Sequence, residues 1–266
     1  MVRAAVLAEF ARIGFQNMLA FRLRYWTGII TYFINVSVYY FIWKAVFAES
    51  PAYGGFDFGQ MMTYVAVGWI IRSMYFNNVD VELADDIMEG KITMAMLRPV
   101  SVQASFIARA AGESGFRLVM LSLPTACVLS LLFPVRPPAS WWAAPAFAVS
   151  ACASVLLVTA LNFIVGTFAI TLKSILGLLR AKFWMQELLS GLLVPVSLFP
   201  SPFRELMGWL PFQHIGYTPM MIYLGKLPAE EVGRALAVQL SWVVALLWFG
   251  GRFWDRMSRR ITIHGG

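Results

Sequence analysis

The residues that could do chemistry in this chain are few, and most of the clustered charges gather in one short polar stretch. The stretch carries Glu82, Asp85, Asp86, Glu89, Lys91 and Arg98. The only histidines of the sequence are His214 and His264, too few for a histidine-rich metal or acid–base cluster. No serine stands in a Gly-x-Ser-x-Gly elbow. We therefore expect no catalytic residue and no metal site, and the chemistry left to these charges is ion pairing with another protein.

The composition is that of a membrane protein. Of the 266 residues, 59% are hydrophobic and 13% are charged, whereas soluble domains carry about 25% charged residues. We expect a single membrane domain over residues 1–266, because the polar segments are too short to bury a core. The net charge of +7 does not indicate a nucleic-acid partner. The lysines and arginines lie at the ends of apolar segments, where they set topology and meet anionic lipid headgroups.

Six apolar segments approach the length of about 20 residues that a membrane-spanning helix needs. They cover residues 27–47, 59–79, 112–133, 145–172, 183–200 and 233–251. The fifth is the weakest, since it is short and contains Gly191, Pro195 and Pro200. The predicted fold class is an all-α membrane protein whose six transmembrane helices occupy residues 27–251.

The distribution of lysine and arginine predicts the orientation. These residues precede the first segment, separate the second from the third and the fourth from the fifth, and follow the sixth. They are Arg3, Arg12, Arg22, Arg24, Lys91, Arg98, Arg109, Lys173, Arg180, Lys182, Arg252, Arg256, Arg259 and Arg260. Because positive charge favours the cytoplasmic face, we predict a multi-pass protein of the cytoplasmic (inner) membrane. Both termini, including a basic tail at 252–266, would then be cytoplasmic.

Residues 1–22 are typical of an amphipathic helix lying along the membrane surface. Val6, Phe10 and Ile13 fall on one helical face, with Leu7 and Phe21 near it. The polar residues off that face are Arg3, Glu9, Arg12 and Gln16. The alternative is a frayed, solvated terminus, which would not need so many large apolar residues.

The segment between the fifth and sixth spans is too apolar for a solvated loop and too rich in proline for one helix. Broken backbone at membrane depth persists only where protein or a water-filled cavity covers it. We therefore predict short re-entrant or interfacial helices on the outer side, at 203–210 and 216–224. The candidate residues of an outer gate are Pro195, Phe199, Pro200, Pro211 and Pro219.

The polar stretch itself reads as two short helices. Leu83 and Ile87 keep helical spacing, Gly90 breaks the pattern, and a second apolar ridge follows before Pro99. A short helix with an apolar ridge suits a groove on another protein, although an ordinary solvated loop explains the residues equally well. The candidate docking residues are Leu83, Asp85, Asp86, Ile87, Met88, Glu89, Gly90, Lys91, Ile92, Met96, Leu97, Arg98 and Pro99.

Three polar residues inside the apolar segments are candidates for a transport pathway: Arg72, Asn162 and Glu187. A charge at bilayer depth costs about 2.5–3.5 kcal/mol on insertion scales, so it usually faces protein or water. Arg72 could pair with Glu187 or face a pathway. Asn162 fits an interhelical hydrogen bond better than a substrate ligand.

Two short motifs in the polar stretch resemble those of a known family. Residues 89–92 read acidic–Gly–x–apolar, and residues 97–101 read Leu–x–Pro–Val–Ser. This pattern is similar to that of the ABC-2 type permeases, the membrane subunits of type V ABC exporters. Lys91 departs from it, since threonine is common there. The N-terminal helix and the outer region 191–225 also look like parts of that family, so the resemblance covers nearly the whole chain. Within the family, the chain looks like the branch in which two paired permeases are encoded with one ATPase.

The resemblance implies a permease subunit that exports an amphipathic or hydrophobic substrate, such as a lipid, a glycan precursor or a drug-like molecule. A separate dimer of ABC ATPase subunits would bind ATP and Mg, and this chain would need no cofactor. The sequence indeed has no Gly-x-x-x-x-Gly-Lys-Ser/Thr phosphate loop. Closure of the ATPases would push on a coupling helix at about 85–96. A second permease, either an identical copy or a paralogue, would complete the pathway.

A channel, a carrier or a membrane scaffold that needs no ATP is the alternative function. It would have the same spans but no ATPase bound to the polar stretch. A membrane-bound acyltransferase or protease is a third class, and it would require polar catalytic groups that the sequence lacks.

Overall fold

The computed structural model describes residues 2–20, 23–172 and 174–261. Several residues used in the sequence-based predictions lie outside the described residues: Phe21, Arg22, Lys173 and residues 262–266, which include His264. The side chains of Arg3 and Arg24 are likewise not described. Within the described residues the chain is helical without strands, apart from an isolated bridge between Tyr53 and Phe56. The predicted all-helical class is confirmed.

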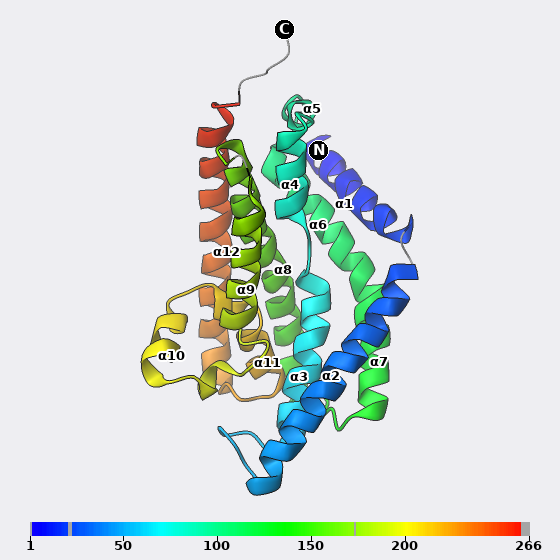
Figure 1. Cartoon of the computed structure of the whole chain (residues 1–266), viewed down its shortest axis with the longest axis vertical. Helices are drawn as coiled ribbons and strands as arrows, with labels where there is room; N and C mark the ends of the chain where they lie inside the picture. Colours follow the sequence, from blue (N-terminus) through cyan, green and yellow to red (C-terminus); the bar gives the residue numbers. More distant parts are fainter. Residues whose placement is uncertain (1, 21–22, 173, 262–266) are drawn as a thin grey trace.

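The long helices run along one axis of the molecule, except that α1 and α2 cross it obliquely (Figure 1). In chain order the elements are α1 (Val2–Ala20), α2 (Leu23–Glu49), α3 (Phe58–Tyr75), α4 (Val79–Met88), α5 (Ile92–Met96), α6 (Val102–Arg117), the π-helical turn η1 (Leu118–Ser122), α7 (Leu123–Leu132), α8 (Ala143–Thr167), η2 (Phe168–Ile170), α9 (Leu176–Leu189), η3 (Val196–Leu198), α10 (Ser201–Gly208), η4 (Phe212–His214), α11 (Tyr217–Tyr223) and α12 (Ala229–Ser258).

Four helical stretches among the described residues are long and apolar enough to cross a membrane. They are Tyr25–Glu49, Val102–Leu132, Ala143–Ile170 and Ala229–Ser258. The second of these is α6, η1 and α7 in one run, and it begins ten residues before the predicted segment 112–133. The structure is thus that of a membrane protein that crosses the bilayer several times.

The other two predicted spans differ from the helices observed. Helix α3 ends at Tyr75 instead of reaching residue 79, and most of its residues are buried by protein. Helix α9 begins earlier than the predicted segment 183–200 and overlaps it only at residues 183–189. The helix ends there because Gly191 adopts a positive φ of 75° shortly after its last turn. Both helices carry a charged residue that lies in the protein interior.

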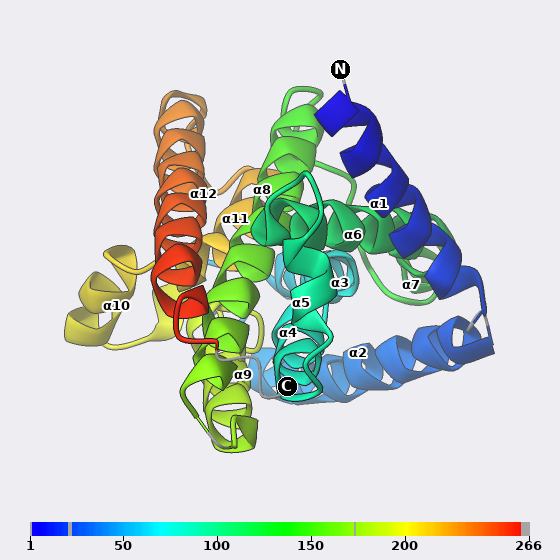
Figure 2. The same ribbon diagram turned by 90° about the horizontal axis from the view of Figure 1, so that it is seen from above.

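The centre of the molecule is formed by α3 and α8, and the other long helices surround them (Figure 2). Tyr64, Ile71 and Leu157 from these two helices are fully buried. The outer helices expose large apolar side chains, such as Trp26 on α2 and Trp248 on α12. Such surfaces suit lipid and would be unusual in water. Both cysteines, Cys127 and Cys152, are exposed on this helical surface.

Helix α1 packs closely against α6, backbone against backbone. A Cβ atom added to Gly112 would collide with the carbonyl oxygen of Ala11, and one added to Gly14 would collide with that of Arg109. Small residues allow helices to approach this closely. The contact turns Gly14 toward α6 and leaves Ile13 exposed.

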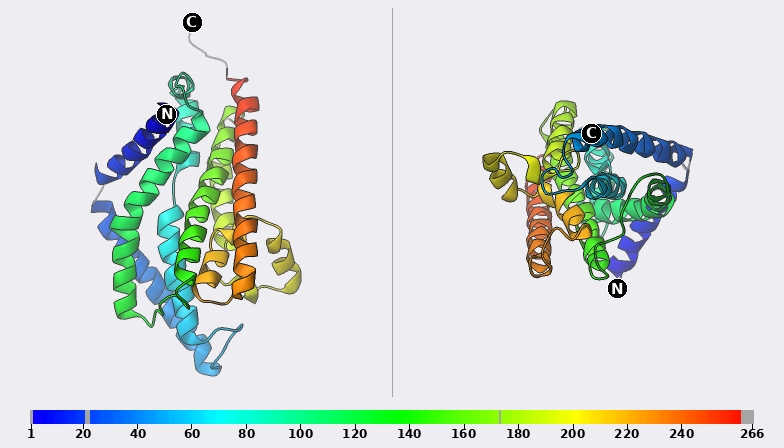
Figure 3. Two further views of the ribbon diagram at one scale, coloured as in Figure 1. Left: turned by 180° about the vertical axis from the view of Figure 1, so that it is seen from behind. Right: turned by 90° about the horizontal axis from the view of Figure 1, so that it is seen from below.

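The two ends of the molecule differ. Helix α1, the α4–α5 segment and the last turns of α12 lie at one end, while the loop before α3, α10 and α11 lie toward the other (Figures 1 and 3). This arrangement agrees with the predicted grouping of the elements into two sides.

Candidate functional site

The predicted docking stretch is a helical hairpin-like projection beyond the bundle, made of α4 and α5. Gly90 lies between them with φ at 73°, a conformation that glycine adopts without strain. The stretch ends where the Ser101 hydroxyl accepts a hydrogen bond from the Ala104 amide at 3.2 Å and caps α6. The two short helices and the break at Gly90 therefore follow the sequence-based prediction.

The inner face of this projection anchors it to the bundle. Leu83 and Ile92 are fully buried and pack with Phe106 and Trp254. Ile87 is half-buried against the same cluster. The prediction that Leu83 and Ile92 form a ridge for a partner is therefore wrong, because both side chains are already covered by this chain.

The outer face of the projection carries side chains that this chain leaves exposed. The exposed residues of the predicted stretch are Asp85, Met88, Glu89, Gly90, Lys91, Met96, Leu97, Arg98 and Pro99, while Asp86 is half-buried. Leu97 is 81% exposed. Met94, which the sequence-based prediction did not include, is 67% exposed. Met94 lies two positions after the buried Ile92, on the opposite face of α5, and this spacing is the signal that could have found it.

The charges of the projection interact with one another and with neighbouring helices. Lys91 pairs with Glu89, which raises the pKa of the lysine. Glu82 pairs with Arg109 of α6 at 2.5 Å; burial raises the pKa of this carboxyl although the guanidinium opposes the shift. The guanidinium of Arg98 lies over the ring of Phe10, 5.2 Å from its centroid, so the projection also contacts α1.

A break in the helical path separates α3 from α4 at residues 76–78. Carbonyl groups freed from a helix inside a membrane need other partners. The Arg117 side chain donates to the Phe76 carbonyl. The Asn162 amide donates to the Asn77 carbonyl at 3.0 Å and to its side-chain oxygen at 2.9 Å. Asn162 thus makes the interhelical hydrogen bond considered from the sequence.

An ion pair that the sequence analysis missed lies beside this break. The ammonium group of Lys182 on α9 is 2.7 Å from a carboxylate oxygen of Asp80 on α4, and both side chains are largely buried. Lys182 also donates to the side-chain oxygen of Asn162 at 2.7 Å. The position of Asp80 directly after the apolar segment 59–79 could have indicated a buried ion pair. The sequence pattern instead places Lys182 among the cations that set the topology.

The pair left open by the sequence, Arg72 and Glu187, forms. Nε of Arg72 on α3 is 2.9 Å from a carboxylate oxygen of Glu187 on α9, with both side chains mostly buried. The guanidinium also lies over the rings of Trp69 and Phe76, at 5.2 and 5.3 Å from their centroids. Because Arg72 lines a cavity as well, the two roles considered for it are compatible.

The outer proline-rich region folds into the short pieces predicted. Helices α10 and α11 match segments 203–210 and 216–224 to within two residues at each end. The candidate gate residues have distinct places: Pro195 precedes η3, Phe199 follows it and is half-buried, Pro200 precedes α10, Pro211 precedes η4, and Pro219 is buried in α11. The Tyr64 hydroxyl donates to the Gly191 carbonyl at 2.5 Å and ties this region to α3.

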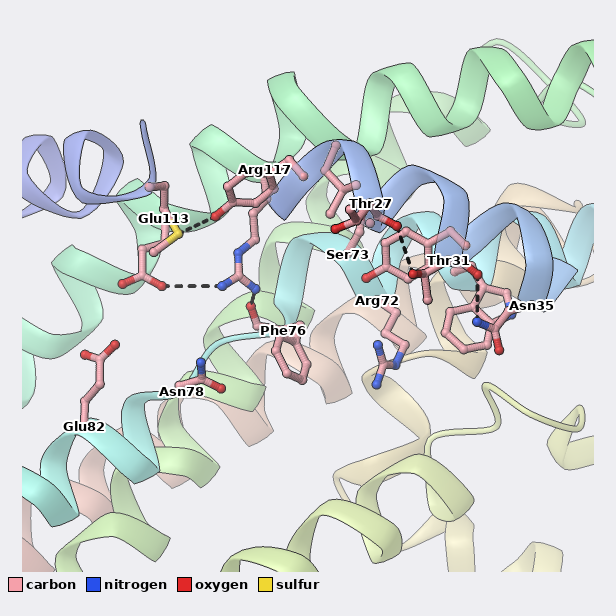
Figure 4. A pocket seen from close by; sticks show the side chains of 16 residues that line it. Thr27, Thr31, Asn35, Arg72, Ser73, Phe76, Asn78, Glu82, Glu113 and Arg117 are labelled. Atoms are coloured by element: carbon pink, nitrogen blue, oxygen red, sulfur yellow. Dashed lines mark hydrogen bonds and ion pairs between the residues drawn. The ribbon is translucent and has the colours of Figure 1, made fainter. Parts of the chain in front are cut away.

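A cavity of about 450 Å³ lies between α2, α3 and α6 (Figure 4). Arg72, Glu82, Glu113 and Arg117 provide its charged groups. The remaining lining residues are Met18, Tyr25, Thr27, Gly28, Thr31, Tyr32, Asn35, Trp69, Ser73, Phe76, Asn78 and Leu121. Among the described residues, no group of histidine, cysteine and acidic side chains could hold a metal ion.

Together these features define a polytopic helical membrane protein with buried ion pairs and a projecting pair of short helices. The family model described as "ABC-2 family transporter protein" matches residues 33–265. The chain therefore belongs to the ABC-2 family of transporter membrane proteins, as its motifs indicated. Members of this family are in general non-catalytic membrane subunits that work with an ATPase subunit. Comparison with curated proteins finds no match.

Proposed function

We propose that this chain is the permease subunit of an ABC exporter that moves an amphipathic or hydrophobic substrate across the inner membrane. The observation that carries this proposal is the projection formed by α4 and α5. It is anchored by buried residues on one face and offers uncovered methionine and leucine side chains on the other. Such a rigid, partly apolar projection suits docking into a groove on a partner protein.

The proposed topology has six spans, with α3 and α9 as the second and fifth. Helix α3 is surrounded by protein and therefore needs fewer lipid-facing apolar residues than α2 or α12. Helix α9 turns Lys182 and Glu187 inward and exposes Trp184 and Leu188. Both termini and the projection lie on the cytoplasmic side in this proposal. Helix α1 is the interfacial connecting helix, and Arg252, Arg256, Arg259 and Arg260, at and just after the end of α12, form the basic end of the single membrane domain.

In the proposed mechanism, closure of two ATPase subunits moves the projection. Met88, Met94 and Leu97 contact the ATPase, and Leu83 and Ile92 pass the displacement to the helices behind them. Exposed charge pairs add only about 0–1 kcal/mol each, so Asp85 and the other acidic residues adjust the contact more than they create it. ATP and Mg bind to the ATPase, and a second permease, identical or paralogous, completes the pathway. The prolines of the outer region form its outer gate.

The direct test is co-purification. The permease is co-expressed with an ABC ATPase encoded next to it, and the amount of ATPase retained is measured for wild type and for Met94→Asp with Leu97→Asp. We expect the double variant to retain at least about ten-fold less ATPase, because each burial of a large apolar side chain contributes about 1.5–3 kcal/mol. Trp209→Asp is the control, since Trp209 is as exposed as Leu97 but lies in the outer region.

Equal retention of the ATPase by wild type and double variant would show that α5 is not the docking element. Transport by the purified permease without ATPase or ATP would instead support the alternative, a carrier or channel.

A further inference from the structure

The cavity between α2, α3 and α6 adjoins a second hollow at the end of the molecule that carries α4 and α5. This groove, of about 590 Å³, lies between α1, α4 and α6. Its lining residues are Gln16, Asn17, Met18, Glu82, Asp85, Asp86, Glu89, Lys91, Arg109 and Glu113. Met18, Glu82 and Glu113 line both hollows. A group entering the groove therefore meets side chains that also face the cavity.

The groove has an excess of negative charge. Five of its lining residues are acidic and two are basic. Both basic groups are already paired, Lys91 with Glu89 and Arg109 with Glu82. This leaves Asp85 and Asp86 without an ion pair to any described residue, and Glu113 with only the long contact to Arg117 at 3.8 Å. A hollow lined by one sign of charge concentrates ligands of the opposite sign, so the groove favours cations.

Glu113 is a buried acceptor that lines both hollows. The residue is 6% exposed, and its carboxylate accepts no hydrogen bond from any described residue. The nearest cation is Arg117, whose Nη2 is 3.8 Å away, too far for a hydrogen bond. Figure 4 shows Glu113 and Glu82 at one end of the cavity with Arg117 beside them. Burying an incompletely paired carboxylate is costly, and a cationic ligand would relieve that cost.

The two arginines of the cavity differ in their partners. The charge of Arg72 is balanced by Glu187, whereas Arg117 donates to the neutral Phe76 carbonyl and lies 3.8 Å from Glu113. One donor, the Nε of Arg117, is buried without a partner and would favour an anion. A test of cation binding should therefore include, as a competitor, an anion of the same size and shape as the cation.

The rest of the wall suits an apolar or aromatic body. Tyr25, Tyr32, Trp69 and Leu121 line the cavity together with four threonine, serine or asparagine side chains of α2 and α3. The cavity also borders the π-helical turn η1 at Leu121, and Arg117 is the residue just before this turn. Such turns occur frequently at functional sites. An amphiphile with one positive charge matches this combination of an acidic entrance and an aromatic interior.

We propose that the cavity binds an organic cation with an apolar or aromatic body, which enters through the acidic groove and places its charge beside Glu113. The proposal names a substrate class for the exporter and thus rests on the proposed function. It does not depend on the identity of the ATPase, because both hollows lie within this chain.

The test measures equilibrium binding of tetraphenylphosphonium to the purified permease in detergent, without ATPase. We expect saturable binding that Glu113→Gln weakens by at least about ten-fold, equivalent to about 1.4 kcal/mol. Glu113→Asp, which keeps the charge, should retain most of the affinity. Glu205→Gln makes the same chemical change at an exposed residue of α10 and should have no effect. Elution as a single species in size-exclusion chromatography shows that each variant is folded.

Tetraphenylborate, an anion of the same shape, should neither bind saturably nor displace the phosphonium. Tighter binding of the borate, or equal phosphonium affinity of wild type and Glu113→Gln, would overturn the proposal. If the phosphonium binds as expected but no ATPase co-purifies, the cation site stands and the exporter assignment fails. If the ATPase co-purifies and the phosphonium does not bind, the exporter assignment stands and the cation site is ruled out.

Discussion

Arg117 of α6 donates a hydrogen bond to the backbone carbonyl of Phe76, the residue that follows the end of α3. The same guanidinium lies 5.5 Å from the centroid of the Phe76 ring. One side chain from a neighbouring helix thus closes a broken helix end that would otherwise leave an unsatisfied carbonyl inside the bundle. The break between α3 and α4 is a stable part of the fold because α6 and α8 supply its missing partners.

The buried pair of Arg72 and Glu187 gives the first prediction. Glu187→Gln leaves the guanidinium without its counter-ion, and breaking a buried pair by removing one partner costs about 3–5 kcal/mol. The double variant Arg72→Met with Glu187→Met should recover most of this loss, since no uncompensated charge remains. The measurement is the free energy of unfolding, in mixed detergent, of wild type, the single variants Arg72→Met and Glu187→Met, and the double variant, which together form a double-mutant cycle. Additive losses in the double variant would contradict a direct interaction.

Asn162 gives the second prediction. Asn162→Ala removes two hydrogen bonds to Asn77 and one from Lys182. Interhelical hydrogen bonds in membrane proteins average about 0.6 kcal/mol, so we expect a loss of about 2 kcal/mol in unfolding free energy. Asn35→Ala is the matched control, because the Asn35 amide donates only to Thr31 of its own helix. Equal losses in the two variants would show that the contacts at the break contribute nothing particular.

The α1–α6 contact gives the third prediction. Gly112→Ala places a methyl group against the Ala11 carbonyl and should force the helices apart, at a cost of about 1–3 kcal/mol. Gly115→Ala, one turn further along α6, has open space around its new methyl group. Thermal unfolding and the rate of tryptic cleavage after Arg12 compare the two variants. Cleavage should accelerate in Gly112→Ala alone, and identical rates would contradict the close packing.

His214 gives a prediction about pH. Burial lowers the pKa of this histidine from 6.5 to about 4, and its Nδ1 lies 2.9 Å from the Thr218 hydroxyl. Between these two pKa values the unfolded chain binds a proton that the folded chain does not. The free energy of unfolding should therefore fall as the pH drops from about 6.5 to about 4, by up to about 3 kcal/mol.

Unfolding measured over this pH range, in wild type and in His214→Gln, checks the prediction. The variant should lose the His214 contribution to the slope, while His264 contributes equally to both curves. Parallel curves for the two proteins would rule out His214 as the titrating group.

The polar stretch shows how far the sequence alone leads. Gly90 was predicted as a break because few other residues fit that role, and the positive φ agrees. The inward direction of Ile92 was not predicted. It depends on Trp254, a residue more than 150 positions away whose helix had to be placed first. Local patterns identify an element, but the partner helix decides which of its faces is buried.

The charged residues of the spans teach the same lesson. The sequence offered both a pair and a pathway for Arg72 and Glu187, since their separation of 115 positions gives no spacing rule. Asp80 and Lys182 were not recognised as a pair for the same reason. The order of the helices around α3 and α8 is determined by tertiary packing, so it could not be predicted from the local patterns of the sequence.

Helix α9 is attached on both sides of the break at residues 76–78. Glu187 holds it to α3, before the break, while Lys182 holds it to Asp80 of α4, after the break. A displacement of α4 relative to α3 must therefore either disrupt one of these ion pairs or swing α9 with it. If α3 and α4 move by the same amount, α9 can keep both ion pairs without changing its orientation. If they move by different amounts, α9 must rotate to keep both pairs. Motion of the projecting tip would thus reach the lipid-exposed side of the bundle as a rotation.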